Sequence, residues 1–357
     1  MRENYLEALK WYGKAADMGN AEAKYKIGKI LWEEGKRYLQ ESWEQGNADA
    51  GTFIKENLRC IEENDGAFIK ENLRCIEEND VCGYLVFKSP KPFSISSRKQ
   101  WDGIIEYSLD KVNWHEWRGE RITSDTIYMR GCRNSVITNG SQWQFETNDR
   151  LICRGNIETL LDYKLCVSGE HPPMKKWCYD EMFKGCTSLS EAPSLPATAL
   201  VDYCYDSMFE GCTSLSEAPS LPARKLAKHC YDGMFKGCTS LKEVPSLPAM
   251  ELELFCYCDM FRGCTSLSKA PSLPATALDD YCYCGMFNGC TSLKEAPSLP
   301  ATKLVRGCYN AMFAGCTSLS EAPSLPATKL AASCYLSMFI GCNSLKEKPD
   351  LPRDCFW

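Results

Sequence analysis

The sequence predicts a multidomain protein with three successive architectures: α-helical repeat hairpins, then a small antiparallel β-sandwich, then an α/β solenoid of 26-residue coils. Three observations predict this fold class. Small and apolar residues at helical spacing occupy the N-terminal part. Alternating apolar and polar residues, broken by Gly, Pro, Asn and Asp, follow them. A cysteine-containing motif then recurs at a spacing of 26 residues. The predicted domains are residues 1–80, 81–165 and 166–357.

Residues 1–80 are expected to form helical hairpins. In the run ALKWYGKAADMGNAEAKYKIGKILWEEG, small residues let two helices approach closely, and Gly19 is placed to end the first helix in a left-handed cap. The run resembles the Sel-one-like repeats, relatives of the tetratricopeptide hairpin. That resemblance implies an adaptor with no chemistry of its own. The sequence FIKENLRCIEEND at 53–65 recurs unchanged at 68–80, again with apolar residues at helical spacing.

Residues 81–165 have the pattern of short strands. GYLVFKSPKPFSIS, WDGIIEYSLD and DTIYMRG alternate apolar with polar residues. IIEYSLDKVNWHEW predicts a hairpin with Asp110 and Lys111 near its turn. The segment GNIETLLDY at 155–163 is expected to form a short helix or turn that covers the first coil. We expect about six to eight strands, with three tryptophans in or beside the core: Trp101, Trp114 and Trp117.

The repeating unit from residue 178 onward is CYxxMFxGC(T/N)SLxxxPxLPxxxL, and its first half occurs seven times. A unit this short cannot bury a core alone, so the coils must stack on one another. We expect the leucines to point inward and the Met-Phe pair to lie beneath a short helical segment that ends at Gly185. The segment SLxxAPSLP would be a short strand, because its prolines each remove a backbone donor.

The motif MFKGCTSL at 182–189, with its six recurrences, resembles the BspA-like leucine-rich repeats of bacteria and some protists. This chain has Met-Phe where that family usually has Ala-Phe, and a proline-rich strand where the family has an isoleucine-rich one, as in a subgroup with PxLPAT units. The resemblance implies an interaction protein of bacterial origin. A bacterial cell-surface adhesin that binds a host protein or a glycan is the alternative role it suggests.

Charge and hydropathy exclude two classes of partner. The net charge of the 357 residues is −6, and the sequence has no basic stripe, so nucleic acid is not expected to bind. No stretch approaches ~18 consecutive apolar residues, so we expect no membrane insertion. The N-terminus lacks an apolar secretory segment. We therefore expect a cytoplasmic protein, or a cell-surface one if a leader precedes Met1.

The 23 cysteines are the unusual feature of the composition. Most recur every 26 residues, so equivalent thiols in stacked coils would lie ~5 Å apart. Packing as small buried residues is the interpretation we prefer. Disulfides and a metal- or redox-active role remain alternatives, with Cys258 and Cys284 as the best candidates for reactivity. We assign no cofactor and no metal ligand.

The sequence contains no arrangement typical of catalysis. Its three histidines, His115, His171 and His229, lie in unrelated contexts and none belongs to a Ser/His/Asp or Cys/His motif. Phosphate-binding, dinucleotide-binding and metalloprotease motifs are also missing from the sequence. We therefore expect a non-enzymatic protein that binds a partner through its repeats.

Two rows of repeat positions are candidate binding surfaces. The first row is acidic with a single lysine, and its alternative interpretation is a solvated face without a partner. The second row varies from coil to coil, which is typical of a binding surface and equally of unconstrained exposed loops. A protein is the expected partner and a glycan the alternative. The first row comprises Glu191, Glu217, Glu243, Lys269, Glu295 and Glu321, and the second Tyr203, His229, Phe255 and Tyr281 with the neighbouring Arg306.

Overall fold

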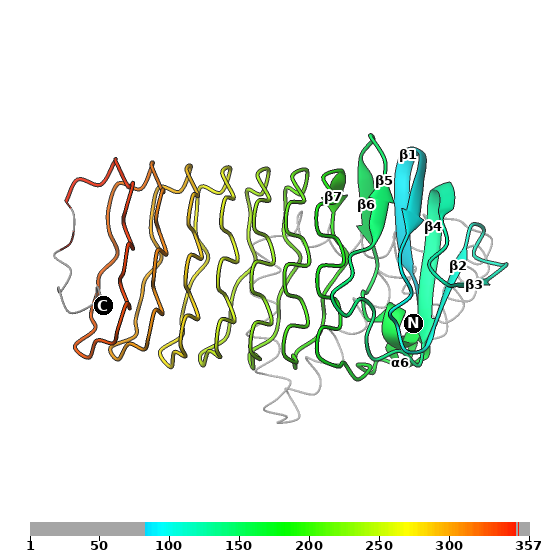
Figure 1. The fold of residues 1–357 in the computed structure, drawn as a ribbon, viewed down its shortest axis with the longest axis horizontal. Coiled ribbons are helices and arrows are strands. Elements are labelled where there is room, and N and C mark those ends of the chain that lie inside the picture. Colours follow the sequence, from blue (N-terminus) through cyan, green and yellow to red (C-terminus); the bar gives the residue numbers. More distant parts are fainter. Residues whose placement is uncertain (1–82, 348, 350–357) are drawn as a thin grey trace, which may run out of the picture. The chain divides into compact units, whose positions relative to one another are not determined.

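The computed structural model describes residues 83–347 and residue 349, within one compact unit that spans Gly83–Trp357. A sheet at its N-terminal end continues directly into a stack of coils (Figure 1). The helical hairpins predicted for residues 1–80 lie outside the described residues. Within the described residues there is one helix, and the remaining regular structure is strand. The predicted fold class is therefore wrong for the described residues, where one mixed sheet and a stack of turns replace the antiparallel sandwich and the α/β solenoid.

The sheet has seven strands in the order β3-β2-β4-β1-β6-β7, with β5 also paired to β1. All pairs are antiparallel except β6 with β7, which is parallel. The last strand, β7, belongs to the first coil, so the sheet and the stack share one ladder. The strands are β1 (Leu85–Ser96), β2 (Ile104–Ser108), β3 (His115–Trp117), β4 (Ile122–Cys132), β5 (Gln144–Glu146), β6 (Leu151–Arg154) and β7 (Leu189–Glu191).

The predicted antiparallel sandwich is replaced by this single mixed sheet. No second sheet is needed, because the first coil covers the apolar side of the strands. Phe87 of β1 and Phe145 of β5 lie 6.3 and 5.4 Å from the ring of Phe183, the first Phe of the repeat. Trp101 and Trp117 are buried and stack at 5.0 Å. The core of the sheet is therefore continuous with the core of the coils.

The predicted hairpin is confirmed. Ile105 of β2 pairs with Trp117 of β3 in antiparallel register. In the turn, a carboxylate oxygen of Asp110 accepts hydrogen bonds from the backbone N–H groups of residues 112 and 113, at 2.9 and 2.8 Å. Lys111 takes a left-handed backbone conformation beside it, with φ of 66°. A short polar side chain before a left-handed residue thus reverses the chain.

The helix, α6 (Thr159–Val167), occupies the segment where a short helix or turn was expected. Leu160 and Leu161 are buried, and the helix packs on β4. The approach is close: a Cβ at Gly131 of β4 would lie 1.6 Å from the carbonyl oxygen of Leu160. Gly131 therefore lets the helix close the lower end of the sheet (Figure 1).

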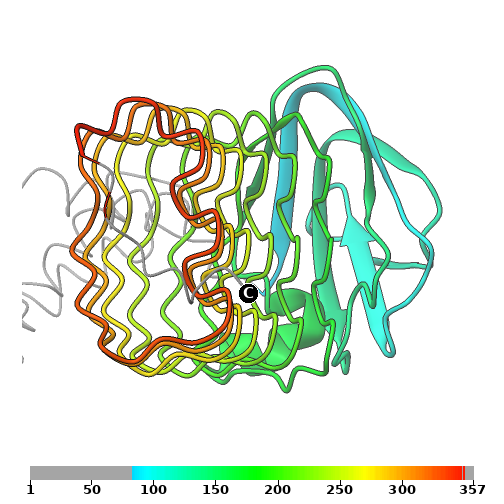
Figure 2. The same cartoon turned by 60° about the vertical axis from the view of Figure 1, so that its left-hand side comes forward.

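The helical segment predicted within each coil is absent from the described coils. The Cys-Tyr to Gly-Cys segment is instead a series of turns. Within a coil, the N–H of Met208 donates to the carbonyl of Tyr205 at 3.3 Å. The N–H groups of Tyr205 and Phe209 donate to the carbonyls of Cys230 and Met234 in the next coil. An α-helix would keep all these bonds inside one coil. In these turns alternate N–H groups instead donate to the next coil, and the coils lie side by side along the stack (Figure 2).

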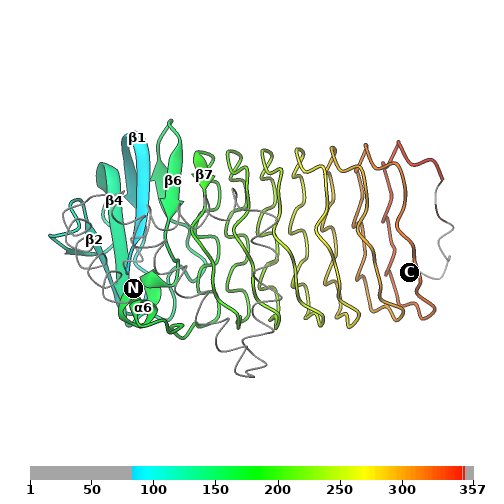
Figure 3. The ribbon, with the colours of Figure 1, turned by 180° about the vertical axis from the view of Figure 1, so that it is seen from behind.

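The proline-rich segments form brief contacts, as expected from their missing donors. Only the first coil contains a named strand, β7. Later coils join through single parallel bridges such as Glu217 with Glu243 and Lys225 with Glu251. The coils stay in register along the whole stack when it is seen from either side (Figures 1 and 3).

The interior of the stack consists of columns of identical residues. Tyr205 lies 5.9 Å from Tyr231, and Phe209 lies 5.6 Å from Phe235, with ring planes nearly parallel. The thiol of Cys212 donates to the carbonyl of Phe183 in the preceding coil at 3.2 Å, and the five later cysteines of this column repeat that bond. These thiols are buried, so they act as small packing residues with a useful donor.

The chain is thus a cysteine-rich repeat protein. In the part of the chain that the structure describes, no helix is sufficiently long and apolar to cross a lipid bilayer.

Candidate binding surface

One position of every coil combines a fixed backbone with a variable side chain. The residue before each Cys-Tyr pair has a left-handed conformation, with φ between 54° and 60° from Trp177 to Ser333. Bulky side chains rarely adopt it. From Trp177 to Gly307 an inter-coil hydrogen bond holds the backbone: the N–H groups of Tyr203 and His229 donate to the carbonyls of Lys228 and Leu254, at 2.9 and 3.0 Å. Strain kept at a variable position is typical of functional surfaces.

Five consecutive coils carry an aromatic ring at this position, and we call them the aromatic ladder: Trp177, Tyr203, His229, Phe255 and Tyr281. Successive ring centroids lie 5.4, 4.4, 4.7 and 4.9 Å apart. From Tyr203 onward the planes are within 18° of parallel. Each ring is partly exposed, and Trp177 is 38% exposed. The structure therefore brings together four predicted site residues and adds Trp177, whose spacing of 26 residues before Tyr203 was the available signal.

Cations close both ends of the aromatic ladder. The ammonium of Lys176 lies 4.4 Å from the ring centroid of Trp177 and 4.6 Å from that of Tyr203. The guanidinium of Arg306, a predicted site residue, lies 5.8 Å from the ring of Tyr281. The next ladder position is Gly307, where a Cβ would lie 2.3 Å from a ring atom of Tyr281. The glycine thus lets the last ring lean over the following coil.

A row of acids and thiols runs beside the aromatic ladder. It occupies the residue after each Cys-Tyr pair and begins Asp180, Asp206, Asp232, Cys258, Cys284. All five side chains are partly buried. We call this row the acid–thiol row. Its aspartates were not among the predicted site residues, although they have the same 26-residue spacing as Cys258 and Cys284.

The aspartates of the acid–thiol row have raised pKa values. Burial, followed by repulsion from Asp206, raises the pKa of Asp180 to about 7. Burial and Asp232 raise the pKa of Asp206 to about 6. Burial and Asp259 raise the pKa of Asp232 to about 7. Partly buried carboxylates in adjacent coils repel one another, which favours their neutral forms.

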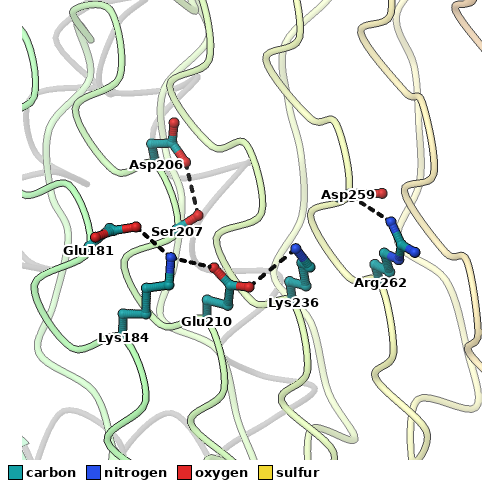
Figure 4. A network of polar contacts seen from close by, with 8 residues as sticks. All are labelled: Glu181, Lys184, Asp206, Ser207, Glu210, Lys236, Asp259 and Arg262. Atoms are coloured by element: carbon teal, nitrogen blue, oxygen red, sulfur yellow. Dashed lines mark hydrogen bonds and ion pairs between the residues drawn. The ribbon is translucent and has the colours of Figure 1, made fainter. Parts of the chain in front are cut away.

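A second, charge-balanced network lies next to the acid–thiol row (Figure 4). Glu210 accepts from Lys184 at 3.1 Å and from Lys236 at 3.2 Å, and Lys184 also pairs with Glu181. Burial opposes ionisation of Glu210, but hydrogen bonds from these two lysines lower its pKa. The nearby Lys184 and Lys236 therefore form ion pairs with Glu210 and not with the aspartates of the row.

His229 links the aromatic ladder to the acid–thiol row. Its Nδ1 atom lies 2.9 Å from Oδ2 of Asp232, and the two side chains are 18% and 23% exposed. One ligand atom each of Asp206, His229 and Asp232 lies within 4.8 Å of the others. Burial lowers the pKa of His229, so the imidazole tends to be neutral.

The thiols of Cys258 and Cys284 interact across adjacent coils. A hydrogen bond with Cys284 and burial raise the pKa of Cys258, while the same hydrogen bond lowers the pKa of Cys284. One sulfur of the pair therefore ionises ahead of the other, because its thiolate accepts a hydrogen bond from the remaining thiol. The cysteine columns that contain Cys212 and Cys204 differ from this pair, because their side chains are buried.

The predicted acidic row lies along another edge of the coils. The backbones of Glu217 and Glu243 form an isolated parallel β-bridge, as do those of Lys269 with Glu295 and of Glu295 with Glu321. These five side chains are exposed and lie next to each other as expected. Glu191 differs from them, because Arg150 and Arg154 pair with its carboxylate at 2.6 and 2.7 Å where β6 meets β7. It helps to hold the sheet to the first coil.

The other histidines are separate from this surface. His115 lies on β3, 5.6 Å from the ring of Tyr107. His171 pairs through Nδ1 with Glu158 at 2.7 Å, near the start of α6. A polar hollow of the sheet region is lined by residues that include Arg98, Gln142 and Glu181. None of these places contains the row of stacked rings that distinguishes the aromatic ladder.

No protein-family model, no curated protein and no solved structure matches this chain.

Proposed function

We propose that this chain is a non-enzymatic binding protein whose aromatic ladder contacts a protein partner. The observation that carries the proposal is the aromatic ladder itself. Rings held in left-handed backbone conformations, stacked, and tied by inter-coil hydrogen bonds lose little conformational freedom when a partner binds. Partly exposed aromatic residues are enriched at protein interfaces for this reason.

The way the rings stack favours a protein over a glycan. Inside the aromatic ladder each ring face is covered by the next ring, as at Tyr203 and His229. The outward parts are ring edges, which carry partial positive charge. Carbonyl and carboxylate oxygens of a peptide chain suit such edges. The cations at the two ends, Lys176 and Arg306, add to the attraction for acidic groups.

We include in this proposal that the chain is a BspA-like leucine-rich-repeat protein. The stacked 26-residue coils support that part of the proposal. That family consists mostly of inferred interaction proteins. Display at a cell surface remains the alternative setting for the same binding role.

Matched variants test the proposal. The seventh coil has Ser333 at the ladder position with the same left-handed conformation, so the coil tolerates serine there. We would measure quantitative affinity capture of binding proteins by the native chain, by Tyr203→Ser/Tyr281→Ser, and by the control Glu217→Gln/Glu295→Gln on the acidic row. We expect the ladder variant to lose at least tenfold of the captured partner and the control to lose none. Equal capture by the native chain and the ladder variant would contradict the proposal.

A further inference from the structure

The meeting point of Asp206, His229 and Asp232 is a place where three metal-binding side chains converge. Asp206 belongs to one coil, and His229 and Asp232 belong to the next. Their ligand atoms lie within 4.8 Å of one another, and the Nδ1 atom of His229 is 2.9 Å from Asp232. Around a tetrahedral zinc ion with bonds of about 2.0–2.2 Å, ligand atoms are about 3.3–3.6 Å apart. Small side-chain rotations would therefore bring all three into coordination distance.

The imidazole is held in place before any ion arrives. Its ring is stacked between Tyr203 at 4.4 Å and Phe255 at 4.7 Å. Its backbone N–H is bonded to the carbonyl of Leu254. Asp206 is oriented as well, because the hydroxyl of Ser207 donates to its Oδ1 atom at 3.0 Å. Supporting contacts of this kind orient metal ligands and raise affinity.

The cluster contains two carboxylates but lacks a cation that pairs with them. Among the residues that the structure describes, no Lys or Arg forms an ion pair with Asp206 or Asp232. The nearby Lys184 and Lys236 are bound to Glu210 instead. Carboxylates that share a partly buried place repel each other unless a positive charge lies between them. A divalent ion would supply that charge.

We propose that Asp206, His229 and Asp232 form a binding site for a divalent transition-metal ion of the zinc class. One carboxylate oxygen from each aspartate and a ring nitrogen of His229 are the ligands, and the fourth position is taken by water or by Cys258, which hydrogen-bonds to Asp232. A mixed set of imidazole and carboxylate favours zinc over calcium or magnesium, which prefer oxygen ligands alone. The proposal goes beyond the binding role above and does not depend on it.

The site differs from the cysteine columns as a metal-binding place. The thiols of Cys212 and Cys238 are buried, and each is bonded to a carbonyl oxygen of the preceding coil. The cluster around His229 is partly exposed, so an ion can reach it.

The test is the binding of zinc by the purified full chain, measured by competition with a chromogenic chelator and by metal analysis after dialysis. The repeats supply a conservative variant: His229→Phe keeps the stack, because the next coil has Phe255 at that position. Asp206→Asn removes a second ligand without changing its shape. The matched control is Asp180→Asn, which changes the neighbouring aspartate of the same row outside the cluster.

We expect one zinc ion per chain in the native protein and in Asp180→Asn. The affinity for zinc should be at least tenfold weaker in His229→Phe and in Asp206→Asn. Zinc should raise the melting temperature of the native chain and not that of His229→Phe, since ligands stabilise only the state they bind. Unchanged zinc affinity in both ligand variants would overturn the proposal. Binding lost in Cys258→Ser/Cys284→Ser but kept in both ligand variants would also overturn it and assign the metal to the thiol pair.

Discussion

The ring of Tyr203 lies face to face with the imidazole of His229, with centroids 4.4 Å apart and planes 7° from parallel. The two residues are 26 positions apart in sequence, and both have left-handed backbones. Their contact therefore depends on the registration of two coils. Interactions between neighbouring coils are the main source of cooperativity in stacked repeats.

His229→Ala removes the ring contacts with Tyr203 and Phe255, which contribute together about 1–3 kcal/mol at about 0.5–1.5 kcal/mol for each aromatic pair. His229→Phe keeps both ring contacts, and both variants lose the bond to Asp232, so the free energy of unfolding of His229→Phe should exceed that of His229→Ala by about 1–3 kcal/mol. Urea denaturation followed by circular dichroism measures the difference. Equal losses in the two variants would show that the stack does not contribute.

Gly237→Ala should destabilise the stack by about 1–2 kcal/mol, because Gly237 has φ of 73° and a Cβ is unfavourable in a left-handed conformation. Space is not the limitation, since the nearest atom to such a Cβ would be 3.7 Å away. Ala311→Gly is the opposite variant: Ala311 has φ of 50°, and glycine should relieve its strain. The two variants should therefore shift the urea midpoint in opposite directions. A shift of the same sign would argue against backbone strain as the cause.

Asp180→Asn should stabilise the protein more at pH 8 than at pH 4. Folding raises the pKa of Asp180 from 3.8 to about 7. Its contribution to stability is therefore fully present below its unfolded pKa and is lost as the pH rises through about 7. Asparagine cannot ionise, so its advantage over the native aspartate grows across that window. Thermal unfolding at intervals between pH 4 and pH 8 measures this advantage.

Asp102→Asn is the control of opposite sign. Burial opposes ionisation of Asp102, but hydrogen bonds from Ser135, Lys175 and the backbone N–H of Val136 lower its pKa. This contribution to stability is present above the unfolded pKa and is lost as the pH falls through the folded one. Asp102→Asn should therefore destabilise at pH 7. If both variants change stability in the same direction at neutral pH, the assignment of these two environments is wrong.

Cys258 and Cys284 should react with an alkylating reagent before the other cysteines of the solenoid. Both are partly exposed, and the hydrogen bond from Cys258 lowers the pKa of Cys284, which raises its thiolate fraction. Cys238 is the reference: it is buried, burial raises its pKa to about 12, and its thiol donates to the carbonyl of Phe209 at 3.1 Å. Brief labelling of the native protein followed by peptide mass spectrometry gives the order. Labelling of Cys238 at the rate of Cys284 would contradict it.

Local patterns predicted the local features of the fold. The turn residues Asp110 and Lys111 predicted the hairpin of β2 and β3, because short polar side chains and a left-handed residue suffice to reverse a chain. The 26-residue period predicted which residues would stack on each other. The prediction of a helical segment within each coil was wrong because the Met-Phe spacing fits both a helix and a series of turns. Bonds to the next coil, such as that from Phe209 to Met234, decide between them.

The candidate site was predicted only in part, because the repeat period shows which positions are equivalent and not which side chains meet. The period identified Tyr203, His229, Phe255 and Tyr281 as equivalent positions, but it equally identified the glutamates of the acidic row. Only the structure showed that the four rings stack, and that His229 also meets Asp206 and Asp232. The aspartates were not predicted because their spacing has no fixed meaning in a series of turns. In a helix or a strand, a separation of three positions tells whether two side chains share a face; in these turns it does not.

The sequence by itself determined the length of the coil, the identity of its buried columns and the order of its variable residues, because these follow from a repeat that must bury its own leucines, aromatics and thiols against the next copy. Tertiary structure alone decided that the N-terminal strands continue into the first coil, since one parallel pair, β6 with β7, joins segments far apart in sequence. It also decided that rings and carboxylates of different coils meet at His229. Contacts between coils depend on the backbone path of each turn, and that path is set by hydrogen bonds to a neighbour that no local pattern contains.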